Sequence, residues 1–331
     1  MIIKLYTNAI SKRVEFQVNK SLPEKDTLLP NVEINKGQST KIQLKSGSNK
    51  NKKISIIIPL FNVQDYISTC LNSIIGQSYW NLEIIVVDDA STDNTVEIVK
   101  NVAMYDKRIQ LITLPQNNGP SFARQKGIDI SSGDLITFVD ADDWYCSSEA
   151  IEKLVYTAEK TDADCIIYGY RVVHNHGIRI KKRFNEKEKM YSVQETAIKK
   201  ITQPSPYWHY LWNKCYKGSV IRENNISFCG KLRGAEDVRF NADFMRYAKN
   251  FYILPNNYLY DYNCTNLNQI TRKSNIGTLQ SELRSFENLK EELHRLSNDF
   301  EFIGVYNQCI IPLYKQFLPI QFSFLNQIIL V

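Results

Sequence analysis

The feature that most constrains this chain is a set of short apolar runs that alternate with helical patterns. Four runs are rich in Ile, Val, Leu and Phe, which is typical of buried strands: residues 54–58, 83–87, 109–114 and 135–139. The stretches between them carry apolar residues on one helix face, for example Ile67, Leu71 and Ile74 after the first run. This alternation predicts parallel β-α-β units, and therefore an α/β fold in which helices flank a central sheet.

Segments with polar residues follow three of these runs directly. They are residues 59–62, which end in Asn62, residues 88–93, which begin with Asp88, and residues 140–143, which begin with Asp140. The carboxyl ends of parallel strands meet at one edge of the sheet, and open α/β sheets bind their ligands beyond that edge. We therefore expect a ligand site that combines these strand ends.

The last strand end is unusually acidic. Asp140, Asp142 and Asp143 place three carboxylates within four residues. Like charges this close repel unless a cation or hydrogen-bond donors offset them. Carboxylate oxygens suit Mg²⁺ or Mn²⁺, which proteins hold with one or two carboxylates plus substrate phosphates. The alternative is a solvated turn that caps the following helix.

Composition excludes several classes of protein. The 331 residues are 43% hydrophobic and 23% charged, as in folded globular proteins, so a disordered or fibrous chain is excluded. The net charge of +6 is spread along the chain rather than concentrated, which argues against a nucleic-acid partner. Seven cysteines without a CxxC pair indicate reduced thiols. The sequence predicts neither a signal peptide nor a membrane span. These features favour a cytoplasmic location.

Four motifs then occur in a set order along the chain. They are an apolar run ending in Pro-Leu-Phe-Asn, an Asp-Asp-Ala-Ser-Thr-Asp segment, an Asn-Gly-Pro turn with an arginine behind it, and a strand ending in Asp-Ala-Asp-Asp: residues 56–62, 87–95, 118–124 and 138–143. Their order and spacing strongly resemble glycosyltransferase family 2 of the bacterial surface-polysaccharide and lipooligosaccharide type. The resemblance covers residues 53–150 closely and residues 200–265 loosely.

The resemblance implies a GT-A fold, with a mixed, mostly parallel sheet flanked by helices. On this basis we expect an N-terminal extension and basic linker at residues 1–52 and a glycosyltransferase domain at 53–255. Within that domain, residues 53–150 would bind the nucleotide and residues 151–255 the acceptor. Residues 256–331 would form a helical C-terminal region.

The resemblance also implies roles for the strand-end residues. Asp88 would bind the nucleobase, Asp140 would lie near the ribose and the metal, and Asp142 would hold a divalent cation, Mn²⁺ or Mg²⁺. The residues expected to contact the nucleotide are Pro59, Leu60, Phe61, Asn62, Asp88, Arg124 and Asp140. Arg124 has a second interpretation as a surface residue.

A sugar transfer with inversion needs a base that accepts the proton of the acceptor hydroxyl. The family pattern supplies it from a Glu-Asp pair that follows a Trp-x-Lys segment. Here Trp212 and Lys214 precede Glu236 and Asp237, so Asp237 is the predicted base and Glu236 the second candidate. An ordinary acidic helix start is the alternative.

Two further features concern the acceptor side. Trp208 and Trp212 are predicted to stack on the donor or acceptor sugar, with burial in the core as the alternative. Asn263 stands where the family often has an arginine after Tyr-Asp-Tyr, which leaves Arg272 or Lys273 as the candidate contact to the diphosphate.

Together these patterns predict an inverting, metal-dependent hexosyl- or N-acetylhexosaminyltransferase. It would move a sugar from a nucleotide sugar, a UDP-sugar, to a hydroxyl of a growing, often lipid-linked, cell-surface glycan. The basic linker and the apolar tail would contact the inner face of the cytoplasmic membrane. The alternatives are a nucleotide-sugar or glycan-binding module without turnover, and a sugar nucleotidyltransferase. The second of these would carry a glycine-rich basic loop where this chain has Pro59 to Asn62.

Overall fold

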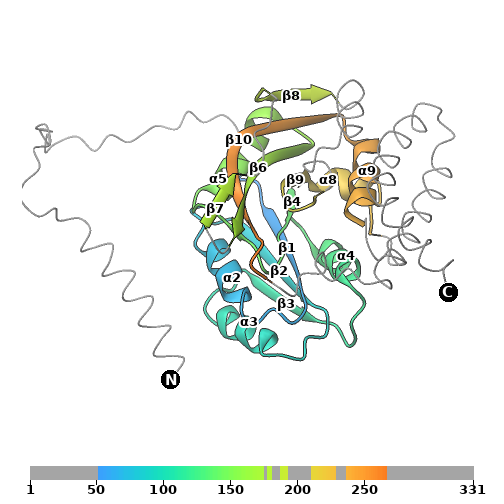
Figure 1. Ribbon diagram of the computed structural model, residues 1–331. Helices are drawn as coiled ribbons and strands as arrows, with labels where there is room; N and C mark the ends of the chain where they lie inside the picture. Colours follow the sequence, from blue (N-terminus) through green and yellow to red (C-terminus); the bar gives the residue numbers. More distant parts are fainter. Residues whose placement is uncertain (1–50, 175–176, 181–186, 193–209, 229–235, 267–331) are drawn as a thin grey trace, which may run out of the picture. The chain divides into compact units, whose positions relative to one another are not determined.

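The computed structural model describes the chain in five stretches, and these form one mixed sheet with helices on both faces (Figure 1). The stretches are residues 51–174, 177–180, 187–192, 210–228 and 236–266. Along the main path the strand order is β3-β2-β1-β4-β9-β6-β10-β5, with β7 on β6 and β8 on β10. The strands are β1 (Ile54–Leu60), β2 (Leu82–Asp88), β3 (Ile109–Thr113), β4 (Leu135–Phe138), β5 (Trp144–Tyr145), β6 (Cys165–His174), β7 (Gly177–Ile180), β8 (Lys189–Ser192), β9 (Lys214–Lys217) and β10 (Asn250–Asn263).

The first half of the sheet is parallel, as the sequence predicts. β1 runs parallel to β2 and β4, and β2 runs parallel to β3. Every residue of β1 and β2 is buried, because helices cover both faces of a parallel sheet. This explains why the two strands are continuous apolar runs rather than alternating ones.

The second half joins the first through antiparallel pairs. β9 lies between β4 and β6 and is antiparallel to both, whereas β6 and β10 are parallel to each other. The predicted mixed α/β sheet is thus confirmed, while parallel pairing is confined to the first half and to β6 with β10. β10 also extends to Asn263, inside the region 256–331 expected to be helical, because Tyr258, Tyr260 and Tyr262 alternate along a strand paired with β6.

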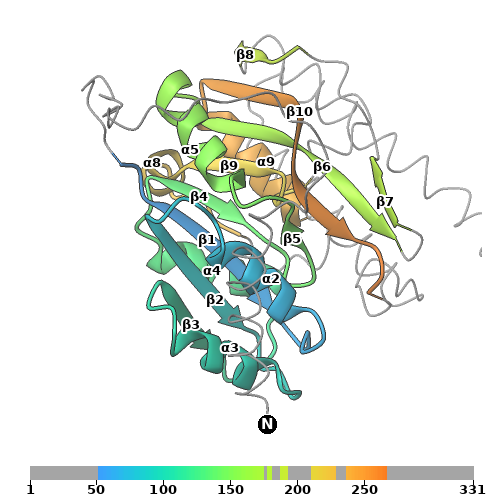
Figure 2. The ribbon, with the colours of Figure 1, turned by 90° about the vertical axis from the view of Figure 1, so that its left-hand side faces the viewer.

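The helices form two layers around the sheet. The two ribbon views agree that α2, α3 and α5 cover one face, while α4, α8 and α9 lie on the other (Figures 1 and 2). Their bounds are α2 (Ile67–Ile75), α3 (Thr95–Ala103), α4 (Pro120–Ile130), α5 (Ala150–Thr161), α8 (Gly218–Glu223) and α9 (Glu236–Tyr247). None of the helices in the described stretches is long and apolar enough to cross a membrane.

An aromatic cluster attaches α9 to the sheet. Phe240 of α9 stacks on Phe228 at a centroid distance of 4.5 Å and meets Phe138 of β4 edge-on at 5.7 Å. One turn later, Phe244 meets Tyr216 of β9 at 5.0 Å. The buried face of α9 therefore fixes the helix, and its first residues, against the strands at the junction of the two halves.

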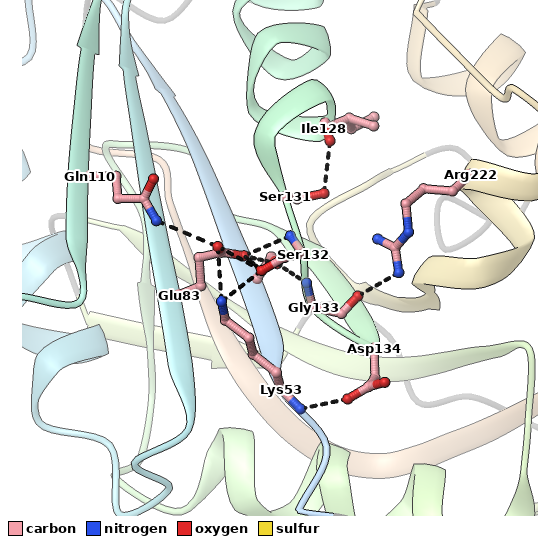
Figure 3. A network of polar contacts seen from close by, with 10 residues as sticks. Lys53, Glu83, Gln110, Ile128, Ser131, Ser132, Gly133, Asp134 and Arg222 are labelled. Carbon is pink, nitrogen blue, oxygen red and sulfur yellow. Dashed lines mark hydrogen bonds and ion pairs between the residues drawn. The ribbon is translucent and has the colours of Figure 1, made fainter.

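The amino end of the parallel strands is closed by a polar network around Glu83 (Figure 3). This buried carboxylate accepts hydrogen bonds from Lys53 Nζ at 3.0 Å, Ser55 Oγ at 2.6 Å and the backbone N–H of Ser132 at 2.9 Å. Burial alone would raise the pKa of Glu83, but the bonds from Ser132, Ser55 and Lys53 outweigh it and lower that pKa. The network ties β1, β2 and the loop before β4 together at the edge opposite the predicted site.

Candidate active site

The loops that follow β1 and β2 are cross-linked into one rim at the carboxyl edge of the sheet. The backbone N–H of Asn62 donates to Ser91 Oγ at 2.9 Å, and the N–H of Thr92 donates to Asn62 Oδ1 at 2.8 Å. Asn62 adopts a left-handed conformation with φ of 50°, which asparagine tolerates better than most residues. The described contacts of the Asn62 side chain thus hold the rim in shape.

The predicted nucleotide-contacting segment Pro59 to Asn62 has one prominent side chain. Pro59 and Leu60 are buried within β1, whereas Phe61 is 44% exposed just beyond the strand. An exposed aromatic ring at this edge offers a flat apolar face to a planar ligand.

The two acids that end β2 have different surroundings. Asp88 is buried, and its carboxylate accepts a hydrogen bond from the backbone N–H of Ser91 at 3.2 Å. Asp89 accepts from the N–H groups of Asn118 at 2.8 Å and Gly119 at 2.7 Å. Both oxygens of Asp89 therefore hold the turn that starts α4, where Gly119 has a φ of 88°. Asp88 remains the acid of this pair predicted to meet a nucleobase.

Asp143 anchors the acidic loop after β4. Its side chain is fully buried and accepts from Tyr260 Oη at 2.9 Å and from the N–H of Asn263 at 2.7 Å. Tyr260 Oη in turn accepts from the N–H of Asp140 at 3.1 Å. Burial, together with the charges of Asp142 and Asp140, raises the pKa of Asp143 well above its ordinary value despite these bonds. The loop is thus attached to β10 by its third acid, and the Asp140 side chain is 29% exposed.

Two asparagines, at the end of β10 and just after it, also contact this loop. Asn266 Nδ2 donates to Asp142 Oδ2 at 2.8 Å, and Asn263 Nδ2 donates to the carbonyl oxygen of Asp142 at 3.0 Å. Asn263, the residue at the position where an arginine was expected, therefore supports the acidic loop. Arg272 and Lys273 lie outside the described residues.

Arg124 joins the two halves of the site. It projects from α4, is 6% exposed, and its Nη2 lies 2.9 Å from Asp140 Oδ1. Its Nη1 lies 3.3 Å from both Glu236 Oε1 and Asp237 Oδ1 at the start of α9. Burial acts to lower the pKa of Arg124, but the charges of Asp237, Asp140 and Glu236 outweigh it and raise that pKa. Three of the acids named from the sequence thus meet around one guanidinium.

Asp237 has the electrostatic surroundings of a base. Burial raises its pKa to about 7, and the charges of Glu236 and Asp140 act in the same direction while Arg124 opposes them. A carboxyl group with such a pKa can accept a proton near neutral pH and release it again.

The Trp-x-Lys segment, residues 212–214, is buried in the core. Trp212 is 3% exposed and has parallel tyrosine rings at 4.6 Å (Tyr210), 5.0 Å (Tyr260) and 5.4 Å (Tyr262). This matches the core alternative rather than an open sugar platform, because the neighbouring rings occupy the indole faces. Trp208 lies outside the described residues.

Lys214 is buried in the same region. Its Nζ donates to Asn213 Oδ1 at 2.9 Å and to the carbonyl oxygen of Tyr210. Burial lowers the pKa of Lys214 to about 7, whereas the nearby charge of Asp237 opposes that change. The lysine therefore adds a titratable positive group behind the predicted base.

Sequence reasoning missed the residues that hold the acids in place. Tyr260, Asn263 and Asn266 come from β10 and the segment after it, more than 100 residues beyond the loop that they contact. The Tyr-Asp-Tyr pattern was the available signal, since its first tyrosine provides the hydroxyl that binds both Asp140 and Asp143.

The described residues contain no group of three His, Cys, Asp or Glu side chains that would hold a metal ion by themselves. Asp140 and Asp142 supply hard carboxylate oxygens at a partly exposed loop. This donor set fits Mg²⁺ or Mn²⁺ when a diphosphate provides further ligands, which is the usual way such ions bind nucleotides.

The chain is similar in sequence to known glycosyltransferases. The family model described as Glycosyl transferase family 2 matches residues 55–216. "Uncharacterized glycosyltransferase EpsJ" of Bacillus subtilis (strain 168) is 31% identical over 222 residues, which cover 66% of this chain and 64% of EpsJ. "Uncharacterized glycosyltransferase YibD" of Escherichia coli (strain K12) is 30% identical over 258 residues, covering 75% of this chain and 72% of YibD.

The fold is also similar to a solved structure. The crystal structure of S. aureus TarS 1-349 in complex with UDP-GlcNAc superimposes with a TM-score of 0.65 at 24% sequence identity. The match covers 80% of this chain and 72% of that one. At this level of identity the likeness establishes the fold alone.

Proposed function

The chain belongs to glycosyltransferase family 2, and we propose that it moves a sugar from a nucleotide sugar to an acceptor hydroxyl with inversion at the anomeric carbon. One observation carries this proposal. The guanidinium of Arg124 contacts both the Asp237 carboxylate, at the start of α9, and the Asp140 carboxylate, in the loop after β4. The proposed base and the proposed phosphate-binding edge are therefore adjacent, which supports a direct displacement.

We propose a UDP-sugar as the donor. Asp88, at the end of β2, would accept a hydrogen bond from a nucleobase N–H. The exposed ring of Phe61 follows Leu60, the residue paired with Asp88 in the sheet, and would lie against the base. TarS, which shares this fold, is described in complex with UDP-GlcNAc, so an N-acetylhexosamine or a hexose is the sugar class to test first.

A divalent cation, Mn²⁺ or Mg²⁺, is the proposed cofactor. Asp142 and Asp140 would hold it together with the diphosphate. When bound, it would stabilise the negative charge that develops on the leaving nucleoside diphosphate.

Asp237 is the proposed catalytic base, with Glu236 beside it. The Asp237 carboxylate takes the proton of the acceptor hydroxyl as the hydroxyl oxygen forms a bond to the anomeric carbon. The bond from that carbon to the diphosphate oxygen breaks with its electron pair, and UDP leaves. Because attack and departure occur on opposite sides of the carbon, the configuration inverts.

The acceptor class that we propose is a hydroxyl of a growing, lipid-linked cell-surface glycan, as the family resemblance implies. Peripheral contact with the inner face of the cytoplasmic membrane would bring the enzyme to such an acceptor. Of the two predicted sugar-stacking residues, Trp208 remains the candidate for direct contact, and Trp212 would act through the tyrosine rings packed on it.

The test is hydrolysis or transfer with a panel of nucleotide sugars in the presence of Mn²⁺, Mg²⁺ or EDTA. We expect one UDP-sugar to release UDP in a metal-dependent manner. Asp142→Ala should abolish this release, and Asp237→Asn should lower it by at least about 100-fold, because a positioned base contributes about 10²–10⁴-fold. Asp129→Ala, which removes a half-exposed carboxylate from the end of α4, is the matched control.

A binding module without turnover is the second candidate, and calorimetry separates it from the enzyme. Binding of UDP with Mn²⁺ but no release from any donor, even with acceptor glycans added, would favour the binding module. Absence of UDP binding would contradict the assigned site altogether.

A further inference from the structure

We propose that Arg124 is a positioning residue that couples the donor-binding strand end to the catalytic base, rather than a ligand of the nucleotide. The inference rests on the proposed function and deepens it. It assigns the proton-transfer geometry of Asp237 to a side chain on α4, more than 100 residues earlier in the chain.

The contacts of the guanidinium carry this inference. Nη2 is engaged by Asp140 at 2.9 Å, and Nη1 is shared by Glu236 and Asp237 at 3.3 Å each. With both terminal nitrogens engaged and the side chain 6% exposed, Arg124 presents little surface to a diphosphate. Its planar fork instead fixes the relative positions of two groups that belong to different halves of the sheet.

The negative charges of the three acids around Arg124 require a nearby cation. Asp140, Glu236 and Asp237 bring three carboxylates together, and Arg124 is the cation that pairs with each of them. Without it, like charges would repel and α9 would move its first turn away from the end of β4. The base would then lie farther from the donor even though the aromatic face of α9 still packs.

The backbone that presents Arg124 is itself closely held. Gly127, less than one turn further along α4, lies so near β1 that an added Cβ would be 2.4 Å from Ile57 Cγ2. The helix therefore cannot approach or slide without moving the strand. The backbone position of Arg124 is thus fixed relative to β1, and its side chain is a buried group rather than an adaptable surface one.

The decisive variant is Arg124→Lys in the full chain. Lysine keeps one positive charge, but its single nitrogen cannot reproduce the two-sided fork. We expect the UDP dissociation constant, measured by calorimetry with Mn²⁺, to stay within about 3-fold of the original protein. We expect kcat to fall by about 10- to 100-fold, because small misplacements of a catalytic group have effects of this size.

The matched control is Arg108→Lys. Arg108 also forms a charged pair, with Asp106 at 2.6 Å, and its side chain is 28% exposed at the opposite edge of the sheet. This variant should change neither kcat nor UDP affinity. If Arg124→Lys does not fold, the double variant Arg124→Lys with Glu236→Gln leaves one ammonium facing two carboxylates, and the same two measurements are made on it.

The outcomes separate the possibilities. UDP affinity weakened by more than about 10-fold with kcat retained at saturating donor would make Arg124 a nucleotide ligand and overturn the inference. Unchanged affinity and unchanged kcat would also overturn it. If the original protein neither binds UDP nor uses any donor, the proposed function fails, and this inference fails with it.

Discussion

At the scale of single residues, the candidate site is distinguished by the different surroundings of a few acids. Asp143 is buried and hydrogen-bonded, Asp140 faces Arg124, and Asp237 sits where ionisation is opposed by burial. Four carboxyl groups of two residue types are thus held in different surroundings: Asp140, Asp143, Glu236 and Asp237.

The pKa of Asp237 gives a prediction about pH. A base works in its ionised form, and a pKa raised to about 7 means that the ionised fraction increases as pH rises through neutrality. We expect kcat/KM to increase with pH, with the midpoint of the increase near pH 7. Glu236→Gln removes a negative neighbour, so it should lower the pKa of Asp237 and move this midpoint to lower pH. A midpoint that stays at the same pH in this variant would contradict the assignment of Asp237 as the base.

Asn266 gives a second prediction at this scale. Its side chain donates to Asp142 Oδ2 at 2.8 Å and thereby orients a carboxylate proposed to hold the cation. Groups that orient metal ligands contribute about 10- to 100-fold to metal affinity. We expect Asn266→Ala to weaken Mn²⁺ binding in the presence of UDP by about 10-fold, as measured by titration calorimetry.

The control for Asn266 is Asn224→Ala at the end of α8. Asn224 also donates through its side-chain amide, to the Val220 carbonyl oxygen at 2.9 Å, but lies outside the site. Equal Mn²⁺ affinity in the two variants would show that Asn266 does not orient the ligand.

At the scale of elements, α9 shows how packing positions the proposed base. Its aromatic residues Phe240 and Phe244 are buried against β4, β9 and Phe228, and its first turn then reaches Arg124. The helix therefore combines an apolar anchor with an acidic start.

This division of α9 predicts the effect of removing its anchor. Phe240 is 1% exposed, and replacing a buried phenylalanine with alanine typically costs about 3–5 kcal/mol of unfolding free energy. We expect Phe240→Ala to lose stability of that order in chemical denaturation. Tyr247→Ala on the same helix, where the side chain is 43% exposed, should cost less than about 1 kcal/mol. Similar losses for both variants would contradict the packing described.

At the scale of the whole molecule, ligand binding should stabilise the folded state, because the site combines strand ends that are far apart in the chain. A ligand that binds only the native protein adds about 2.7 kcal/mol of stability when its concentration is 100 times its dissociation constant. We expect UDP with Mn²⁺ to raise the unfolding temperature, and EDTA to remove most of that increase.

Asp142→Ala provides the matched comparison for this experiment. Its unfolding temperature without ligand should remain close to that of the original chain, because Asp143, and not Asp142, provides the buried anchor of the loop. With UDP and Mn²⁺ the increase should disappear. A variant that is stabilised as strongly as the original chain would place the cation elsewhere.

The sequence by itself determined the parallel half of the sheet and the acids at its edge. β1, β2, β3 and β4 are local apolar runs, and a strand end is read directly from the polar residue that follows it. The order of the motifs is equally local, because each motif is a short run of neighbouring residues. The family and the candidates Asp88, Asp140 and Asp237 therefore follow from the amino-acid sequence alone.

Only the tertiary structure decided which of these acids lie together. The insertion of β9 between β4 and β6 brings α9 to the parallel half of the sheet, and no local pattern specifies such an antiparallel join. It also decided that Trp212 is core and that Asn263 supports the acidic loop. It placed Arg124 between Asp140 and Asp237 as well. Long-range pairing sets these contacts, because charge and burial depend on neighbours that are distant in the sequence.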